Sequence, residues 1–124
     1  MEYRNDYCLT YCIAKILNLD VEKVPYFAAF EFNWIKALRL FLQIYNLNVK
    51  VILYTPDTEL MLNNIKSLYK IGVININEDD TDTHAIVLNN DLSLSYDPNI
   101  KDNLTANYQK EDLSYVILIN KVLG

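Results

Sequence analysis

The chain has 124 residues, 52% of them hydrophobic, with only two Gly and three Pro, so we expect one folded domain spanning residues 1–124. Its net charge of −5 and its lack of clustered Lys or Arg argue against a nucleic-acid partner. No apolar run reaches the ~20 residues that span a bilayer, and the first residues show no secretion signal. We therefore expect no membrane association and a cytoplasmic location.

Three helices are predicted in the first half of the chain. Helical periodicity predicts the first over residues 7–18, with Asn5 or Asp6 as its N-cap, and few of its positions look exposed. A second amphipathic helix is predicted over 34–45, and a weaker third over 57–69. The third helix has four apolar side chains that are predicted to face inward: Leu60, Leu62, Ile65 and Leu68.

The second half of the chain favours strands. They are predicted over 48–54 and 71–76, as a hairpin over 84–97, and over 114–122, with a polar acidic loop at 77–83. Helices first and antiparallel strands after them indicate an α+β domain, with N-terminal helices packed on a mostly antiparallel sheet.

The predicted hairpin brings two polar residues together. Residues 89–91, Asn-Asn-Asp, are a turn signal, because Asn and Asp tolerate positive φ. A two-residue turn there would pair Val87 with Leu94 and, farther along, His84 with Asp97. Residues directly opposed on antiparallel strands hold their Cβ atoms roughly 4.5–5.5 Å apart. We therefore predict that His84 contacts Asp97, unless an odd loop length shifts the register.

Cys8 completes a candidate catalytic triad with His84 and Asp97. It lies in the first turn of the predicted helix, where backbone amides are free and the helix dipole favours a thiolate. An adjacent carboxylate orients an imidazole and stabilises its charged form. Cys12, one turn deeper, is predicted to be a buried packing residue. Two Cys so close on one helix are poorly placed for a disulfide, which fits a reducing compartment.

Other readings of the same residues remain open. His84 could be a structural or surface residue, and the Tyr-Asp-Pro at 96–98 an ordinary turn at a strand end. Cys8, Cys12, His84 and Asp97 could supply four zinc ligands, although zinc-binding Cys pairs usually lie in loops. The acidic stretch 78–82 lacks the Gly and Glu of a calcium loop. We predict no metal and no cofactor.

These residues resemble a known family. The chain resembles small papain-like cysteine peptidases, similar to those that remove double-glycine leaders from bacteriocins and to their bacterial and phage relatives. The resemblance implies a papain-like fold, with Cys8 as nucleophile, His84 as base and Asp97 as its orienter. It covers most of the chain and rests on five segments: residues 6–14 (DYCLTYCIA), 17–25 (Leu-Asn-Leu and Val-Pro at its ends), 34–42, 84–87 (HAIV) and 96–98 (YDP).

The sequence departs from this family in two places. The family commonly has Gly after the nucleophile, where this chain has Leu9. It also has a Gln five or six residues upstream that donates to the oxyanion, where this chain has Tyr3 and Glu2; Asn5 could donate an amide but lies closer. Loss of one oxyanion donor can cost about 10²–10³ in rate.

Three functions follow as expectations. The first is a small papain-like cysteine hydrolase that cleaves a peptide or amide bond through Cys8, His84 and Asp97. The second is a catalytically degenerate papain-like protein that binds a partner, for example a phage-encoded inhibitor of a host protein. The third is a thiol-dependent acyltransferase that uses the same site. All three imply a peptide or protein as substrate or partner.

Overall fold

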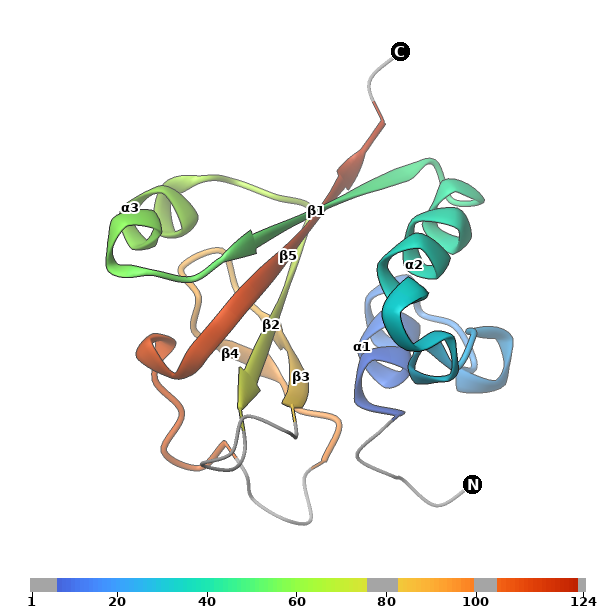
Figure 1. Ribbon diagram of the computed structural model, residues 1–124, viewed down its shortest axis with the longest axis horizontal. Helices are drawn as coiled ribbons and strands as arrows, with labels where there is room; N and C mark the ends of the chain where they lie inside the picture. The colour runs from blue at the N-terminus through green and yellow to red at the C-terminus, as the bar shows by residue number, and fades with distance from the viewer. Residues whose placement is uncertain (1–6, 76–82, 100–104, 123–124) are drawn as a thin grey trace.

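The computed structural model describes residues 7–75, 83–99 and 105–122 (Figure 1). Its five strands form one antiparallel sheet in the order β1-β5-β2-β3-β4. In the middle, β5 (Leu113–Lys121) pairs with β1 (Leu47–Leu53) on one side and β2 (Tyr69–Asn75) on the other. Next come β3 (Thr83–Leu88) and, at the edge, the short β4 (Leu94–Tyr96). The fold is therefore α+β, as predicted.

Helices cover both faces of the sheet. Figure 1 shows α1 (Cys8–Leu17) and α2 (Trp34–Gln43) on one face and α3 (Pro56–Asn64) on the other. Two cores result, because strand side chains alternate between the faces. The core beneath α1 and α2 includes Cys12, Leu38, Ala85 and Ile117, and the core beneath α3 includes Leu62, Ile86, Val116 and Leu118. Among the described residues, 3₁₀ turns occur at η2 (Val21–Lys23), η3 (Phe27–Asn33) and η4 (Lys110–Asp112). Within the described residues, no helix is long and apolar enough to cross a membrane.

Two helix predictions need correction. Tyr7 occupies the N-cap position of α1 and makes no side-chain cap hydrogen bond; Asn5 and Asp6, the predicted caps, lie outside the described residues. The third helix ends at Asn64 because Ile65 adopts an extended conformation that leads the chain into β2. Of its four apolar residues predicted to face inward, only Leu62 is buried, while Leu60, Ile65 and Leu68 are exposed.

The hairpin register also differs from the prediction. The N–H of Asn89 donates to the carbonyl of Ser93, so the loop holds three residues, and Leu92 adopts a positive φ of 71°. A three-residue loop that ends in a left-handed residue is a common hairpin connection. A bulge then shifts the register again, so Val87 pairs with Tyr96 instead of the predicted Leu94. His84 and Asp97 are therefore not directly opposed.

Candidate functional site

The first helix packs against the free edge of β3 through its two cysteines. Strand β4 pairs with β3 only at Val87 and Leu88, which leaves the earlier part of that edge uncovered by β4. There the N–H of Ala85 donates to Cys8 Sγ at 3.2 Å, and Cys12 Sγ donates to the Ala85 carbonyl oxygen at 3.3 Å. The two sulfurs thus make the backbone hydrogen bonds that a neighbouring strand would otherwise make to Ala85. The sulfur of Cys8 consequently lies at the edge of the sheet, next to Ala85, which directly follows His84 in β3.

His84 and Asp97 make the predicted contact through a different geometry. His84 Nε2 lies 2.6 Å from Asp97 Oδ1. If the bulged register continued past Tyr96, Asp97 would lie opposite Ile86, two residues from His84 on the same face. Such diagonal neighbours are about 7–8 Å apart at Cα, which long side chains can bridge. The contact was correctly predicted, but the register argument that led to it was wrong.

Asp97 is held by three donors. Its Oδ1 accepts from His84 Nε2 and from the backbone N–H of Asn99 at 2.8 Å, and its Oδ2 accepts from the hydroxyl of Thr105 at 2.6 Å. The carboxylate is therefore fixed in orientation from both oxygens. Because Nε2 is engaged by Asp97, Nδ1 is the ring nitrogen that remains for a thiol.

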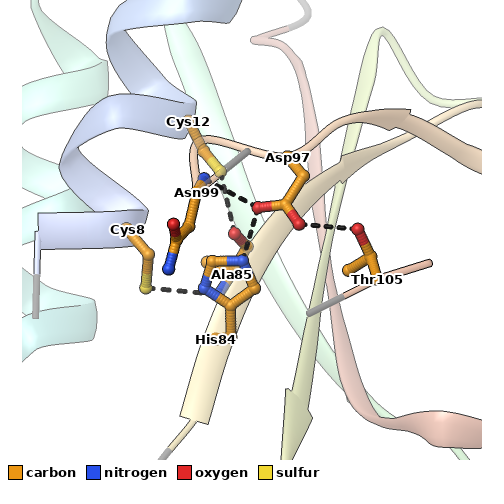
Figure 2. Close-up of polar contacts among 7 residues, drawn as sticks. All are labelled: Cys8, Cys12, His84, Ala85, Asp97, Asn99 and Thr105. Carbon is orange, nitrogen blue, oxygen red and sulfur yellow. Dashed lines mark hydrogen bonds and ion pairs between the residues drawn. The ribbon is translucent and has the colours of Figure 1, made fainter. Parts of the chain in front are cut away.

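The thiol of Cys8 faces that second nitrogen. Figure 2 shows the Cys8 side chain pointing toward the His84 ring, with Asp97 on the far side of the ring. His84 is fully buried, and Nδ1 has no hydrogen-bond partner among the described residues. The structure thus brings Cys8, His84 and Asp97 together, with a sulfur near the imidazole that is not hydrogen-bonded to it. Catalytic contacts in free enzymes are often this loose and tighten only with substrate.

Burial determines the electrostatics of both thiols. The pKa of Cys8 is raised by burial, and the charge of Asp97 adds to the rise, while the N–H groups of Ala85 and of the first helical turn act to lower it. Burial, with smaller contributions from Cys8 and Asp97, raises the pKa of Cys12 well above its usual value. The N–H groups at the helix terminus favour a Cys8 thiolate, as predicted, but burial has the larger effect on the pKa of this thiol. An isolated Cys8 thiol stays protonated at neutral pH.

Asn99 and Thr105 are polar residues of the site that the sequence prediction missed. Asn99 could have been found, because an Asp commonly accepts from the backbone N–H two residues later, as Asp97 does here. Thr105 follows the strand by several residues in a segment without periodicity, and no sequence signal marks it.

The described residues give no support to a metal site. No group of three or more His, Cys, Asp or Glu side chains gathers among them in an arrangement that could hold a metal ion. The zinc alternative therefore lacks a described ligand set, and the acidic stretch 78–82 lies outside the described residues. So do Glu2, Tyr3 and Asn5, the positions relevant to an upstream oxyanion donor.

Two of the surface cavities formed by the described residues share Tyr96, the residue before Asp97, but do not contain the site. One, of about 510 Å³, is lined by residues that include Lys15, Lys70 and Tyr96, and a second, of about 260 Å³, shares Lys15 and Tyr96 with it. Lys15 Nζ lies over the Tyr96 ring, 5.2 Å from its centroid, and both residues line both cavities. Neither cavity is lined by Cys8, His84 or Asp97, although Tyr96 directly precedes Asp97.

No protein-family model matches the chain, and no curated protein matches it in sequence.

Proposed function

We propose that this protein is a small papain-like cysteine hydrolase that cleaves a peptide or amide bond. One observation carries the proposal: a thiol in the first turn of a buried helix faces the second nitrogen of an imidazole whose first nitrogen is held by a carboxylate. These are the three parts that thiol-based acyl transfer needs, in the order that it needs them.

The reaction would begin with a proton transfer. The proton of Cys8 Sγ moves to His84 Nδ1, which leaves a thiolate and an imidazolium that Asp97 stabilises. The thiolate attacks the substrate carbonyl carbon, and the amine leaves with the proton from Nδ1 as the thioester forms. His84 then takes a proton from water, whose oxygen attacks the thioester, and Cys8 regains its proton as the acid product departs.

Burial of the thiol sets the resting state of this proposal. Because burial raises the pKa of Cys8, its thiol would rest protonated and would have to lose its proton for the reaction to begin. Proton transfer from Cys8 to His84 creates two opposite charges next to each other, which burial disfavours less than a lone thiolate. We therefore expect a nucleophile that is activated by His84 and not by the helix terminus alone.

A second candidate function is a binding protein that has lost catalysis. It is favoured by the burial of the same groups, since Cys8 is only 8% exposed and His84 fully buried. In that case the protein would bind a peptide or protein partner, for example as a phage-encoded inhibitor of a host protein. In either case we expect it to act in the cytoplasm, where its two thiols stay reduced.

Thiol labelling combined with peptide hydrolysis tests the proposal. Native protein is treated with iodoacetamide at pH 7.5, and the labelled positions are mapped by mass spectrometry. Labelling should occur at Cys8 well before Cys12 and should slow in His84→Ala. Incubation with a defined peptide mixture should give new peptide termini, at a rate that falls at least about 10³-fold in Cys8→Ala.

Cys12→Ala is the matched control, because it removes a neighbouring thiol from the same helix and should leave hydrolysis largely intact. Products joined to an added amine would identify the acyltransferase alternative. Labelling at Cys12 before Cys8, or a Cys8 rate that does not depend on His84, would contradict the hydrolase proposal. A reactive Cys8 with no hydrolysis of any peptide would favour the binding protein.

A further inference from the structure

Thr105 begins a turn that is fastened to the chain on both sides of β4. Its carbonyl oxygen accepts from the N–H of Tyr108 at 3.1 Å, which closes the turn. The Tyr108 hydroxyl donates to the carbonyl oxygen of Leu92 at 2.8 Å, in the loop before β4. The Thr105 hydroxyl donates to Asp97 Oδ2 at 2.6 Å, directly after β4. The turn therefore holds Thr105 against the carboxylate of the site.

Strand β4 alone leaves the direction of the Asp97 side chain open. The strand has three residues and pairs with β3 at two positions, and Asp97 lies just beyond its end. His84 Nε2 and the backbone N–H of Asn99 both donate to Oδ1, whereas the described residues supply the Thr105 hydroxyl to Oδ2. Figure 2 shows this hydroxyl directed at the carboxylate oxygen that does not contact His84. Thr105 thus fixes the half of the carboxylate that the other two donors leave free.

The proposed reaction needs this carboxylate to be charged and to keep one orientation. When the Cys8 proton moves to His84 Nδ1, the Asp97 oxygen at Nε2 stabilises the imidazolium. A hydroxyl that donates to Oδ2 favours the charged form of the carboxyl group and keeps Oδ2 turned away from the imidazole. The Asp97 side chain is only 9% exposed, so water does not readily replace a hydrogen bond that is lost there. The orientation of the imidazole therefore depends on the donor at Oδ2.

We propose that Thr105 is a positioning residue, whose hydroxyl acts through Asp97 to hold the His84 ring with Nδ1 toward Cys8. This inference rests on the proposed function, because it needs a thiolate and an imidazolium to form. The effect of Thr105 on the sulfur passes through two intervening side chains, those of Asp97 and His84.

The pH dependence of Cys8 alkylation tests this role without a known substrate. The rate of iodoacetamide modification at Cys8 is measured between about pH 6 and 10 for the wild type, Thr105→Val and Thr105→Ser. Val has nearly the shape of Thr but no hydroxyl, and Ser keeps the hydroxyl. Thr105→Val should slow alkylation at neutral pH by about 10-fold, the lower end for loss of a hydrogen bond to a charged group, and should move the profile to higher pH. Thr105→Ser should stay close to the wild type. These variants leave unchanged the titratable groups around the thiol: His84 on β3, Asp97 beyond β4, Cys12 in α1 and Tyr115 on β5.

Thr58→Val is the matched control. It makes the same substitution in α3, which covers the face of the sheet opposite α1 (Figure 1). The Thr58 hydroxyl donates to the carbonyl oxygen of Leu53 at 2.8 Å and accepts from the N–H of Thr55 at 2.8 Å. Loss of these bonds should lower the free energy of unfolding without changing the Cys8 profile. Should Thr105→Val fail to fold, Thr105→Ala, which also lacks the hydroxyl, carries the test.

The outcomes separate this inference from the proposed function. Slower alkylation in His84→Ala and Thr105→Val, with a near wild-type profile in Thr105→Ser, supports both. If His84→Ala slows alkylation but folded Thr105→Val matches or exceeds the wild-type rate, the inference is wrong and the proposed function stands. The inference is also wrong if Thr105→Ser is as slow as Thr105→Val, or if the slower rate comes without a shift of the pH profile, because packing and not the hydroxyl would then explain the effect. If His84→Ala does not change the rate either, no thiolate is activated at this site, and the proposed function fails together with the inference.

Discussion

The sharpest test of the site compares two substitutions of Asp97. In Asp97→Asn, the amide oxygen can occupy the position of Oδ1, because that oxygen accepts from both His84 and Asn99. The amide nitrogen then replaces Oδ2 and donates to the Thr105 hydroxyl, which rotates to accept. All three hydrogen bonds survive and only the charge is lost. In Asp97→Ala, all three donors lose their acceptor.

The two variants should therefore differ in stability. A buried donor without a partner costs about 1–3 kcal/mol, and two of the donors that lose their acceptor in Asp97→Ala, on His84 and Asn99, belong to buried residues. This variant should therefore lose about 2–6 kcal/mol of unfolding free energy. Asp97→Asn keeps neutral bonds in place of charge-assisted ones and should lose about 1–2 kcal/mol. Urea unfolding followed by circular dichroism measures both.

Reactivity should respond to the charge and not to the number of hydrogen bonds. A unit charge about 4 Å from the imidazolium stabilises it by about 4 kcal/mol at an effective dielectric constant near 20, which corresponds to about 10³ in rate. Iodoacetamide labelling of Cys8, and any hydrolysis, should fall by about this factor in Asp97→Asn. Wild-type reactivity in a folded Asp97→Asn protein would refute the role of Asp97 as the imidazolium's counter-charge. Equal stability losses in the two variants would refute the hydrogen-bond account.

Two further predictions concern stability away from this carboxylate. The pKa values of Cys12 and Tyr108 are raised in the folded protein, mainly by burial, so the unfolded chain releases these protons first as the pH rises. Their contribution to stability should be complete below pH 9 and lost progressively above it, and Tyr108→Phe should flatten the loss in urea titrations above pH 10. Lys70→Met should lower the unfolding free energy by about 1–3 kcal/mol, because Lys70 Nζ donates to the carbonyl oxygens of Leu62 at 2.7 Å and Asn90 at 2.6 Å. An unchanged urea midpoint would mean that relief of ammonium burial offsets the lost bonds.

Local sequence signals predicted the elements better than their ends and pairings. The first helix and the four long strands follow from apolar periodicity, which packing on both sides of the sheet enforces. The predicted third helix runs too far because Ile65 and Leu68 are apolar residues of the kind that fill a core, whereas both are exposed in the connection to β2. Sequence patterns cannot separate these two environments when the residue types are the same.

The sequence predicted which residues form the candidate site, but not the strand register and packing that bring them together. The contact between His84 and Asp97 was expected from a two-residue turn, yet the loop has three residues and β4 is bulged. The positive φ at Leu92, which ends the three-residue loop, could not be predicted from the sequence, because Leu rarely adopts that conformation. The approach of Cys8 depends on the open edge of β3 at Ala85, a long-range feature that no local pattern encodes.

The unpaired nitrogen of His84 favours the proposed catalytic role over a purely structural one. A fully buried polar atom without a partner costs about 1–3 kcal/mol, and an apolar residue of similar size would avoid that cost. Nδ1 has no partner among the described residues, while Nε2 is held at 2.6 Å by a carboxylate that is itself anchored by two further donors. A histidine that only filled the core would gain nothing from having one ring nitrogen bound to a carboxylate and the other unpaired. A base that must accept a proton from Cys8 requires it, because the accepting nitrogen has to be free before the reaction and the opposite side has to stabilise the resulting charge.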